Sequence, residues 1–493
     1  MLHGLRNRSV IAATSVAVAM LSSCLTEADD PLDSVEHTLV SSHGINVTGE
    51  RWISPRTIEV DIWTALISAR RAVNGPHRIR ITLPSSYAQA TAARYPVVYL
   101  LHGGAGGNSA QWTSAGGAAE HITAGQQVIV VMPDGGKVGW FTNWVDQSRG
   151  TQRWADFYLT QVIPWVDVNF RTVASRNGRA IAGLSMGGYG AVRLAQDRPD
   201  LFASVASFSG AVDLGDLGTR TVVTEQAIQH GLPAFGPFGS PLPPGDTVWR
   251  QQDPMRRASA LLGMQVLLYA GAGTNDVDVL ERTMGASADR FAKKLADAGV
   301  PHFWWMYGRP GPASPFGCDG GHNFSCWNFA FNDALPRMLS VLQVPSIPPP
   351  PPPPPGTDVV VNGGFESGLH AWGCLGQCGF DQAGLARSGA GNGWVRNTGG
   401  WNDVHQTVPV APNRTHVVKA WIRTSANNGD GYVGLRTASG HVVGEQRFLN
   451  LGGYTQVTVT VNSGNNTSLE VFAGLWANGD TWLQVDDVSV VVN

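Results

Sequence analysis

The sequence predicts two folded domains, an α/β domain followed by an all-β sandwich. Its 493 residues exceed the size that one hydrophobic core usually organises, and 43% of them are hydrophobic. Strand and helix patterns alternate in the first part, whereas the last part contains only short strand patterns. A run of eight prolines, Pro348–Pro355, separates the two parts and predicts a stiff polyproline II spacer.

The sequence of the first part predicts a mostly parallel sheet covered by helices. Residues 78–83 alternate apolar and polar side chains, and other runs are continuously apolar, as in strands buried on both faces. These runs are residues 96–101, 128–132, 179–182 and 265–269, and helical patterns lie at 154–170, 187–196 and 287–298. We expect functional residues at the carboxyl ends of such strands.

The last part predicts an antiparallel sandwich. Its strand candidates, residues 407–410, 417–421 and 456–461, are separated by Gly, Asn and Asp turns. With the linker between them, we expect the α/β domain at residues 51–343, the linker at 344–356 and the sandwich at 357–493.

The N-terminus predicts export. Residues 1–24 carry arginines, then a short apolar run, then small residues, as in a signal peptide. Leu21-Ser22-Ser23-Cys24 resembles a bacterial lipobox, which makes Cys24 a lipidation candidate; an ordinary cleaved signal is the alternative. Residues 25–50 are expected to be a flexible spacer. The protein would be secreted or lipid-anchored to the cell envelope, with no other membrane link.

The charge and the cysteine count limit which partners, cellular compartments and metal sites the sequence supports. A net charge of −3 with 14% charged residues offers no basic surface for nucleic acid. Four cysteines remain after Cys24, an even number suited to an oxidising compartment. Nearness in sequence pairs Cys318 with Cys326 and Cys374 with Cys378; a zinc site is disfavoured because the usual ligand spacing is missing.

Gly183-Leu184-Ser185-Met186-Gly187 follows a predicted strand and leads into a helical pattern. This is the context of a GxSxG nucleophile elbow, in which a tight turn holds the serine hydroxyl above the sheet. An earlier strand runs into His102-Gly103-Gly104, a loop of the type that directs a backbone N–H at a developing oxyanion. We therefore expect Ser185 as nucleophile and the amides of Gly104 and Met186 as the oxyanion hole.

A serine nucleophile also needs a base and an orienting acid. In chain order the acid follows the serine, and Asp276 is the first carboxylate after the strand at 265–269, with Asp278 and Glu281 as alternatives. His322 lies in Gly320-Gly321-His322, flanked by two cysteines, and is the expected base. A Cys318–Cys326 bridge would stiffen this loop.

The segments YLLHGG, GLSMGG, GTND and GGHNFSCW occur in the order shown by the esterase family of α/β-hydrolases, which includes feruloyl esterases, S-formylglutathione hydrolase and mycolyltransferases. This resemblance implies an α/β-hydrolase fold and serine-ester chemistry without a cofactor. Trp140–Trp144 most resembles the mycolyltransferase branch, whose acid is commonly glutamate, so an aspartate favours the feruloyl-esterase pattern. Trp112, Trp140 and Trp144 are the candidate walls of the substrate pocket.

The last domain resembles jelly-roll carbohydrate-binding modules in its first and last segments, Asn362–Gly368 and Trp482–Val488. That resemblance implies a possible structural calcium at Glu366 and Asp487, although two carboxylates supply only part of the usual ligand set. Aromatic rings can stack on sugars, and core packing is the alternative for each. The candidates are Trp394, Trp401, Tyr432 and Trp476.

These features predict an exported serine esterase that acts on acyl esters of carbohydrate, such as feruloyl or acetyl esters of polysaccharide, and is held on polysaccharide by its last domain. An acyltransferase that passes the acyl group to a sugar or glycerol hydroxyl is the close alternative. A binding protein without activity is a third hypothesis, against which the complete set of catalytic motifs argues.

Overall fold

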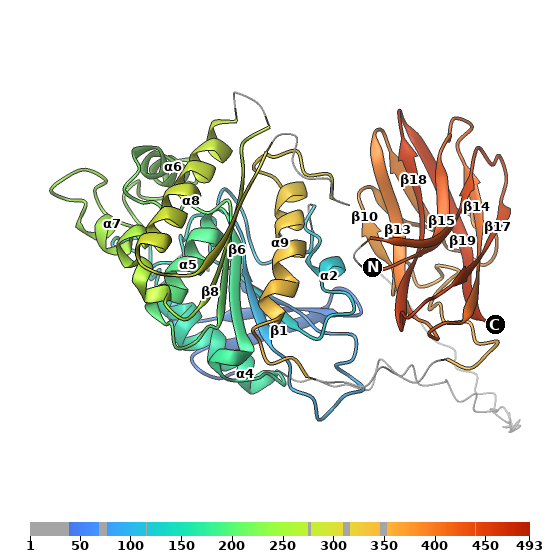
Figure 1. The fold of residues 1–493 in the computed structure, drawn as a ribbon, viewed down its shortest axis with the longest axis horizontal. Coiled ribbons are helices and arrows are strands. Elements are labelled where there is room, and N and C mark those ends of the chain that lie inside the picture. The colour runs from blue at the N-terminus through green and yellow to red at the C-terminus, as the bar shows by residue number, and fades with distance from the viewer. Residues whose placement is uncertain are drawn as a thin grey trace, which may run out of the picture. The chain divides into compact units, whose positions relative to one another are not determined.

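The computed structural model describes residues 39–68, 76–114, 116–274, 278–308, 316–345, 353–438 and 440–493. The first domain contains a nine-stranded sheet in the order β1-β2-β3-β5-β4-β6-β7-β8-β9 (Figure 1). Its strands are β1 Asn46–Trp52, β2 Thr57–Trp63, β3 His77–Thr82, β4 Val97–Leu101, β5 Ile129–Pro133, β6 Arg179–Leu184, β7 Ser204–Phe208, β8 Gln265–Gly271 and β9 His302–Tyr307.

Six neighbouring strands, β5, β4, β6, β7, β8 and β9, run parallel to one another. Strands β1, β2 and β3 add an antiparallel edge next to β5. Their continuous apolar runs are buried because helices cover both faces of the sheet. The longer helices are α4 Ile163–Asn169, α5 Met186–Asp197, α6 Leu217–Gln229, α8 Val279–Asp297 and α9 Phe324–Leu339. This arrangement confirms the predicted α/β-hydrolase fold.

The two faces of the sheet have separate cores. Side chains of α4, α5 and α8 pack with one set of alternating strand residues, such as Tyr99 and Ile181. The opposite set, such as Leu100 and Ala182, packs with α9 and the short helix α2 (Ala119–Ile122). The predicted helix at 154–170 is divided into α3 Trp154–Asp156, a π-helical segment Phe157–Val162, and α4.

The start of the described chain belongs to this domain. We expected a flexible spacer up to residue 50, but Leu39 and Ile45 are buried in the core and β1 begins at Asn46. Most side chains of this edge strand are exposed, so its sequence shows little alternation of apolar and polar residues. The strand was therefore not predicted.

The second domain consists of two five-stranded antiparallel sheets in the orders β10-β13-β18-β15-β16 and β11-β12-β19-β14-β17 (Figure 1). Their strands are β10 Gly373–Leu375, β11 Cys378–Asp381, β12 Asn392–Asn397, β13 Gly400–Pro409, β14 Thr415–Thr424, β15 Gly431–Arg436, β16 Val442–Phe448, β17 Thr455–Asn462, β18 Ser468–Ala477 and β19 Thr481–Val492. One apolar core lies between the sheets. The first and last segments meet, since Asp358 bridges to Val491, as expected for the predicted sandwich.

Candidate active site

The nucleophile candidate Ser185 lies on the turn between β6 and α5. Its backbone has a φ of 51°, a left-handed conformation that non-glycine residues rarely adopt. The two flanking glycines are needed for the turn: a Cβ on Gly183 would lie 2.4 Å from the Gly187 carbonyl oxygen, and one on Gly187 would lie 2.5 Å from that of His102. The sequence motif therefore has the local geometry of a nucleophile elbow.

Two predicted oxyanion donors lie beside this turn. Met186 is the first residue of α5, so its amide has no partner within the helix. Gly104 lies in residues 102–107, which we call the oxyanion loop. His102 holds this loop, since its Nδ1–H donates to the Gly103 carbonyl at 2.7 Å and its Nε2 accepts from the Gly135 amide at 2.7 Å. His102 is buried, and these contacts give it a structural role in the loop.

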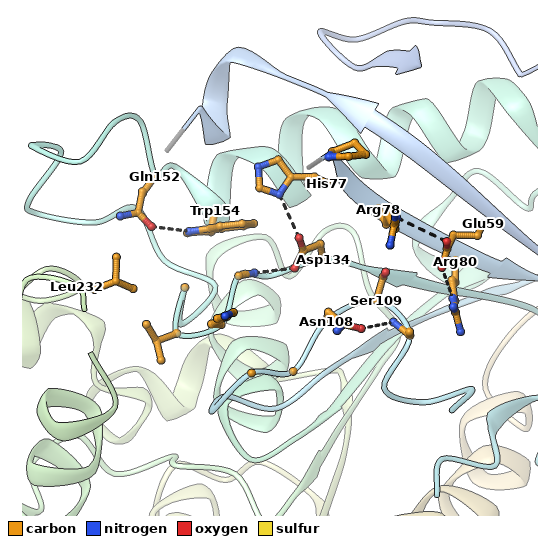
Figure 2. Close-up of a pocket in the computed structure, with 18 of the residues that line it drawn as sticks. Glu59, His77, Arg78, Arg80, Asn108, Ser109, Asp134, Gln152, Trp154 and Leu232 are labelled. Carbon is orange, nitrogen blue, oxygen red and sulfur yellow. Dashed lines mark hydrogen bonds and ion pairs between the residues drawn. The ribbon is translucent and has the colours of Figure 1, made fainter. Parts of the chain in front are cut away.

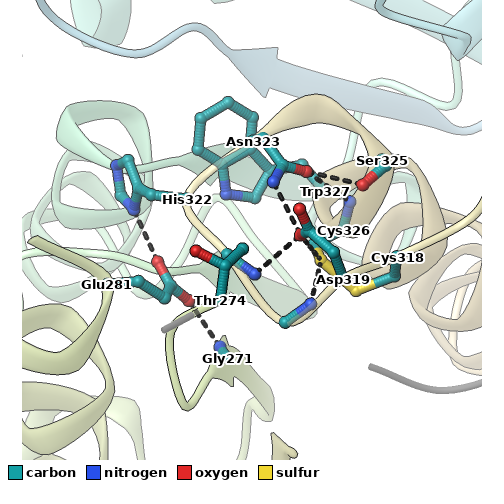
Figure 3. The surroundings of a disulfide bond; sticks show 12 residues. Gly271, Thr274, Glu281, Cys318, Asp319, His322, Asn323, Ser325, Cys326 and Trp327 are labelled. Atoms are coloured by element: carbon teal, nitrogen blue, oxygen red, sulfur yellow. Dashed lines mark hydrogen bonds and ion pairs between the residues drawn. A yellow bond between two sulfur atoms is a disulfide. The ribbon is translucent and has the colours of Figure 1, made fainter. Parts of the chain in front are cut away.

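His322 lies on the loop before α9 and reaches the nucleophile. Its Nε2 is 3.0 Å from the Ser185 hydroxyl oxygen. The loop is held by the Cys318–Cys326 disulfide, which the sequence predicted, and by Asp319, which accepts from the Gly321 amide at 2.9 Å (Figure 3). These contacts restrict the loop and keep the imidazole close to Ser185.

The acid at His322 is Glu281, and the assignment to Asp276 is corrected. Asp276 itself lies outside the described residues. The Glu281 carboxylate is fully buried and lies 2.5 Å from His322 Nδ1 (Figure 3). We favoured Asp276 because it comes first after the strand, but the first turn of α8 carries the longer glutamate side chain back to the imidazole.

Asp278, the other alternative, has a different task. It is the N-cap of α8 and accepts from the amides of Glu281 and Thr274. Burial opposes ionisation of this carboxyl, but these amide donors outweigh it and lower its pKa. Asp278 therefore fixes the start of the helix that presents Glu281.

Residues that the sequence did not single out complete the support of Glu281. The Ser209 hydroxyl donates to its Oε1 at 2.8 Å, and the Gly271 amide donates to the same oxygen. Trp327 Nε1 donates to Ser209 at 3.2 Å, and its ring meets His322 edge to face with centroids 4.9 Å apart. Ser209 follows the last residue of β7 and has a φ of 50°. Its position directly after a strand was the one feature of the sequence that could have indicated a functional role.

Ser185, His322 and Glu281 form a hydrogen-bonded chain from hydroxyl to imidazole to carboxylate, next to two backbone amides. Such a chain raises the nucleophilicity of serine and stabilises the imidazolium that forms when the hydroxyl loses its proton. Residues 71–338 match the model of the Esterase family, described as "Putative esterase", which is more than half of the 493 residues. The chain belongs to this family.

Individual relatives fit the same family. The chain is 34% identical over 237 residues to Esterase Rv1288 of Mycobacterium tuberculosis, covering 45% of this chain and 50% of that protein. It is 26% identical over 256 residues to the diacylglycerol acyltransferase/mycolyltransferase Ag85B of Mycobacterium leprae, covering 50% and 76%. A solved ferulic acid esterase aligns with 58% of this chain and 99% of its own, with a TM-score of 0.41 and 21% identity. The chain thus spans about half the length of the first of these relatives.

The three predicted pocket tryptophans have different positions. Trp112 is fully buried in the core, donates to the Leu101 carbonyl and packs on Phe208, so its assignment to the pocket is wrong. Trp140 is also buried, but its backbone amide lies 3.3 Å from the Met186 sulfur, close to the nucleophile. Trp144 lines a cleft beside the oxyanion loop.

Three of the four predicted sugar-stacking residues gather on one sheet of the second domain. Trp401 on β13 lies directly opposite Trp476 on β18, with ring centroids 5.8 Å apart, and Tyr432 on β15 is 6.2 Å from Trp401. Trp476 is 53% exposed. We call Trp401, Tyr432 and Trp476 the aromatic face. Trp394 lies on β12 of the other sheet and covers Gly379, so it is not part of this face.

Polar side chains adjoin the aromatic face. Trp401 Nε1 donates to Asp403 at 2.6 Å, which fixes the indole. Arg436 bridges Asp403 and Glu470 through contacts of 2.6 Å and 2.9 Å. These three charged groups are buried, so they fix the indole of Trp401 rather than present charge at the surface.

The predicted calcium ligands have other partners. Asp487 accepts from Arg387 and from the Ser388 hydroxyl, and Glu366 accepts from the Ala390 amide at 3.0 Å. Both carboxylates therefore meet the loop before β12, where Arg387 supplies the positive charge. Calcium at this place stays a prediction.

Two remaining predictions concern cysteines. Cys374 and Cys378 form the second expected disulfide, with Cα atoms 5.7 Å apart. Cys24 and the signal segment lie outside the described residues, and within the described ranges no helix is long and apolar enough to span a membrane.

Replacing Ser209 with alanine should slow turnover without weakening substrate binding. The change removes a hydrogen bond to a buried carboxylate, a contact that contributes about 1.5–3 kcal/mol, so kcat should fall about tenfold to hundredfold with KM unchanged. Steady-state kinetics on an aryl ester measures both. Ser204→Ala removes a buried hydroxyl at the far end of β7 and is the matched control. Equal kcat values for the two variants would contradict a positioning role for Ser209.

Proposed function

We propose that this protein is a serine carboxylic-ester hydrolase that acts through an acyl-enzyme. The observation that carries the proposal is the continuous chain Ser185–His322–Glu281, with contacts of 3.0 Å and 2.5 Å. Membership of the esterase family supports it independently.

The geometry supports the following steps. Ser185 Oγ attacks the ester carbonyl carbon while His322 Nε2 takes its proton, and the carbonyl oxygen becomes an oxyanion at the amides of Gly104 and Met186. Collapse of this intermediate breaks the bond to the alcohol oxygen, which receives the proton from His322. Water then attacks the acyl-enzyme with the same base, and the acid and free Ser185 are released. Glu281 holds the imidazole tautomer and balances its positive charge throughout.

Carbohydrate esters are the proposed substrate class. The aromatic face, with exposed Trp476 beside fixed Trp401, supports a sugar-binding role for the second domain. A domain that holds polysaccharide raises the concentration of ester near Ser185 without adding a catalytic contact. Two disulfides support export to an oxidising compartment.

Acyl transfer to a sugar or glycerol hydroxyl is the second candidate. The argument from an aspartate acid no longer applies, because Glu281 matches the glutamate that is common in the mycolyltransferase branch. A mycolyltransferase relative of Mycobacterium leprae is matched over 76% of its length, which favours the same candidate. Hydrolysis and transfer share the acyl-enzyme and differ in which nucleophile attacks it.

Ser185→Ala should reduce kcat for 4-nitrophenyl acetate by at least ~10⁴-fold, because the nucleophile is lost while the oxyanion donors remain. Release of nitrophenolate measures the rate. Wild-type turnover in the variant would remove Ser185 from the mechanism. Adding glycerol or trehalose to the wild type and measuring new ester by mass spectrometry separates the two candidates: ester formed faster than free acid would replace hydrolase by transferase.

Trp476→Ala should weaken binding of the full chain to insoluble xylan about tenfold, because burying an aromatic ring on a ligand contributes at least ~1.4 kcal/mol. Depletion of protein from solution by the polysaccharide measures the affinity. Phe380→Ala on the other sheet removes a ring that is 45% exposed and should have no effect. Equal affinity of the two variants would exclude the aromatic face as the sugar site.

A further inference from the structure

A cleft with charged, amide and apolar side chains in its lining lies beside the oxyanion loop at the carboxyl ends of β4 and β5 (Figure 2). Its volume is about 370 Å³, which is within the range of small-molecule sites. We call it the Asp134 cleft. Its lining includes Arg80, Asp134, Lys137, Trp144, Gln152 and Trp154.

The cleft adjoins the reacting centre. Two glycines of the oxyanion loop are part of its wall. Helix α6 and the residues after it lie near both the oxyanion loop and the cleft. The Gln226 side chain of α6 lies against Gly104. Leu232, just beyond the end of the helix, lines the cleft. The wall of the cleft therefore begins two residues along the chain from the proposed oxyanion donor Gly104.

The polar groups of the cleft are fixed in place. Arg80 donates to Glu59 at 2.6 Å, and His77 Nδ1 lies 3.1 Å from the Asp134 carboxylate. Burial opposes ionisation of Asp134, but the neighbouring imidazoles of His102 and His77 outweigh it and hold the pKa of this carboxyl well below its usual range. An apolar acyl chain placed here would remove these charges from water without giving them partners. A ligand rich in hydroxyl groups would supply those partners.

One wall residue has an unused hydrogen-bond donor. Gln152 is 6% exposed, and its Nε2 has no partner among the described residues. Its Oε1 accepts only a long hydrogen bond, 3.4 Å, from Trp154 Nε1 (Figure 2). A buried amide donor without an acceptor costs about 1–3 kcal/mol, which a ligand oxygen would recover.

The rim and walls supply the remaining elements of a sugar site. Lys137 is exposed and has no ion-pair partner within the described ranges. The indoles of Trp144 and Trp154 also line the cleft; each is 4% exposed, so together they add a small apolar area to its wall. Hydrogen-bond donors, acceptors and a small apolar area thus occur together beside the oxyanion loop.

We infer that the Asp134 cleft binds the saccharide part of the ester, with Gln152 as a specificity-determining donor. This inference rests on the proposed function, and it assigns the cleft to the alcohol side of the scissile ester bond. The acyl group then lies outside the cleft, and the alcohol that leaves in the first step is the sugar held by Gln152.

Kinetics with one acyl group on two alcohols tests the inference. The Gln152→Met substitution keeps side-chain length and removes the amide. For acetylated xylobiose, kcat/KM should fall about tenfold through KM, whereas for phenyl acetate it should stay within about twofold. Gln251→Met, on the exposed surface of α7 (Thr247–Gln252), is the matched control. A fall of equal size for both esters, or no fall for either, would overturn the assignment.

Inhibition by free sugars tests the cleft without relying on the choice of ester. Xylobiose, cellobiose or trehalose should inhibit phenyl acetate hydrolysis competitively in the wild type, with an inhibition constant about tenfold higher in Gln152→Met. Binding at the aromatic face alone would not inhibit, and absence of inhibition by all three sugars would overturn the inference. If the wild type does not hydrolyse phenyl acetate, the proposed function fails, whereas hydrolysis of phenyl acetate without sugar inhibition contradicts the saccharide subsite alone.

Discussion

The buried carboxylate of Glu281 is the group on which the site depends. A fully buried carboxylate is costly unless hydrogen bonds satisfy it, and here the donors come from three other segments: Gly271 at the end of β8, Ser209 at the end of β7, and His322 before α9. The same contacts that make its burial acceptable also orient the imidazole. Folding of this part of the sheet and assembly of the catalytic chain are therefore one event.

The other half of the site follows from close backbone approach. Ser185 adopts a left-handed conformation because glycines on either side let β6, α5 and the end of β4 come within contact distance. The oxyanion loop is held by His102, a histidine that does no proton transfer with the nucleophile. Rigid backbone on one side and a disulfide-held loop on the other bring Ser185 and His322 together.

The sequence predicted what local motifs determine and missed what depends on three-dimensional packing. Ser185 and His322 were found because glycines and strand ends mark them. Asp276 was predicted as the acid because it is the first carboxylate after the strand. In the structure, the Glu281 side chain extends from the first turn of α8 to the imidazole of His322. Trp112 follows the oxyanion loop directly, yet its indole turns inward to the Leu101 carbonyl. Gln152 Nε2 has no partner among the described residues, and no sequence signal shows this, because it depends on how the folded chain surrounds the amide.

Glu281, rather than Asp276, orients His322, and the turnover numbers of Glu281→Gln and Asp276→Asn on one aryl ester distinguish the two carboxylates. Loss of the triad carboxylate with its shape retained lowers kcat by roughly 10⁴-fold where the histidine tautomer depends on it. We predict a fall of about 10³- to 10⁴-fold for Glu281→Gln and a change within about threefold for Asp276→Asn. A large loss in Asp276→Asn together with near wild-type turnover in Glu281→Gln would contradict this account.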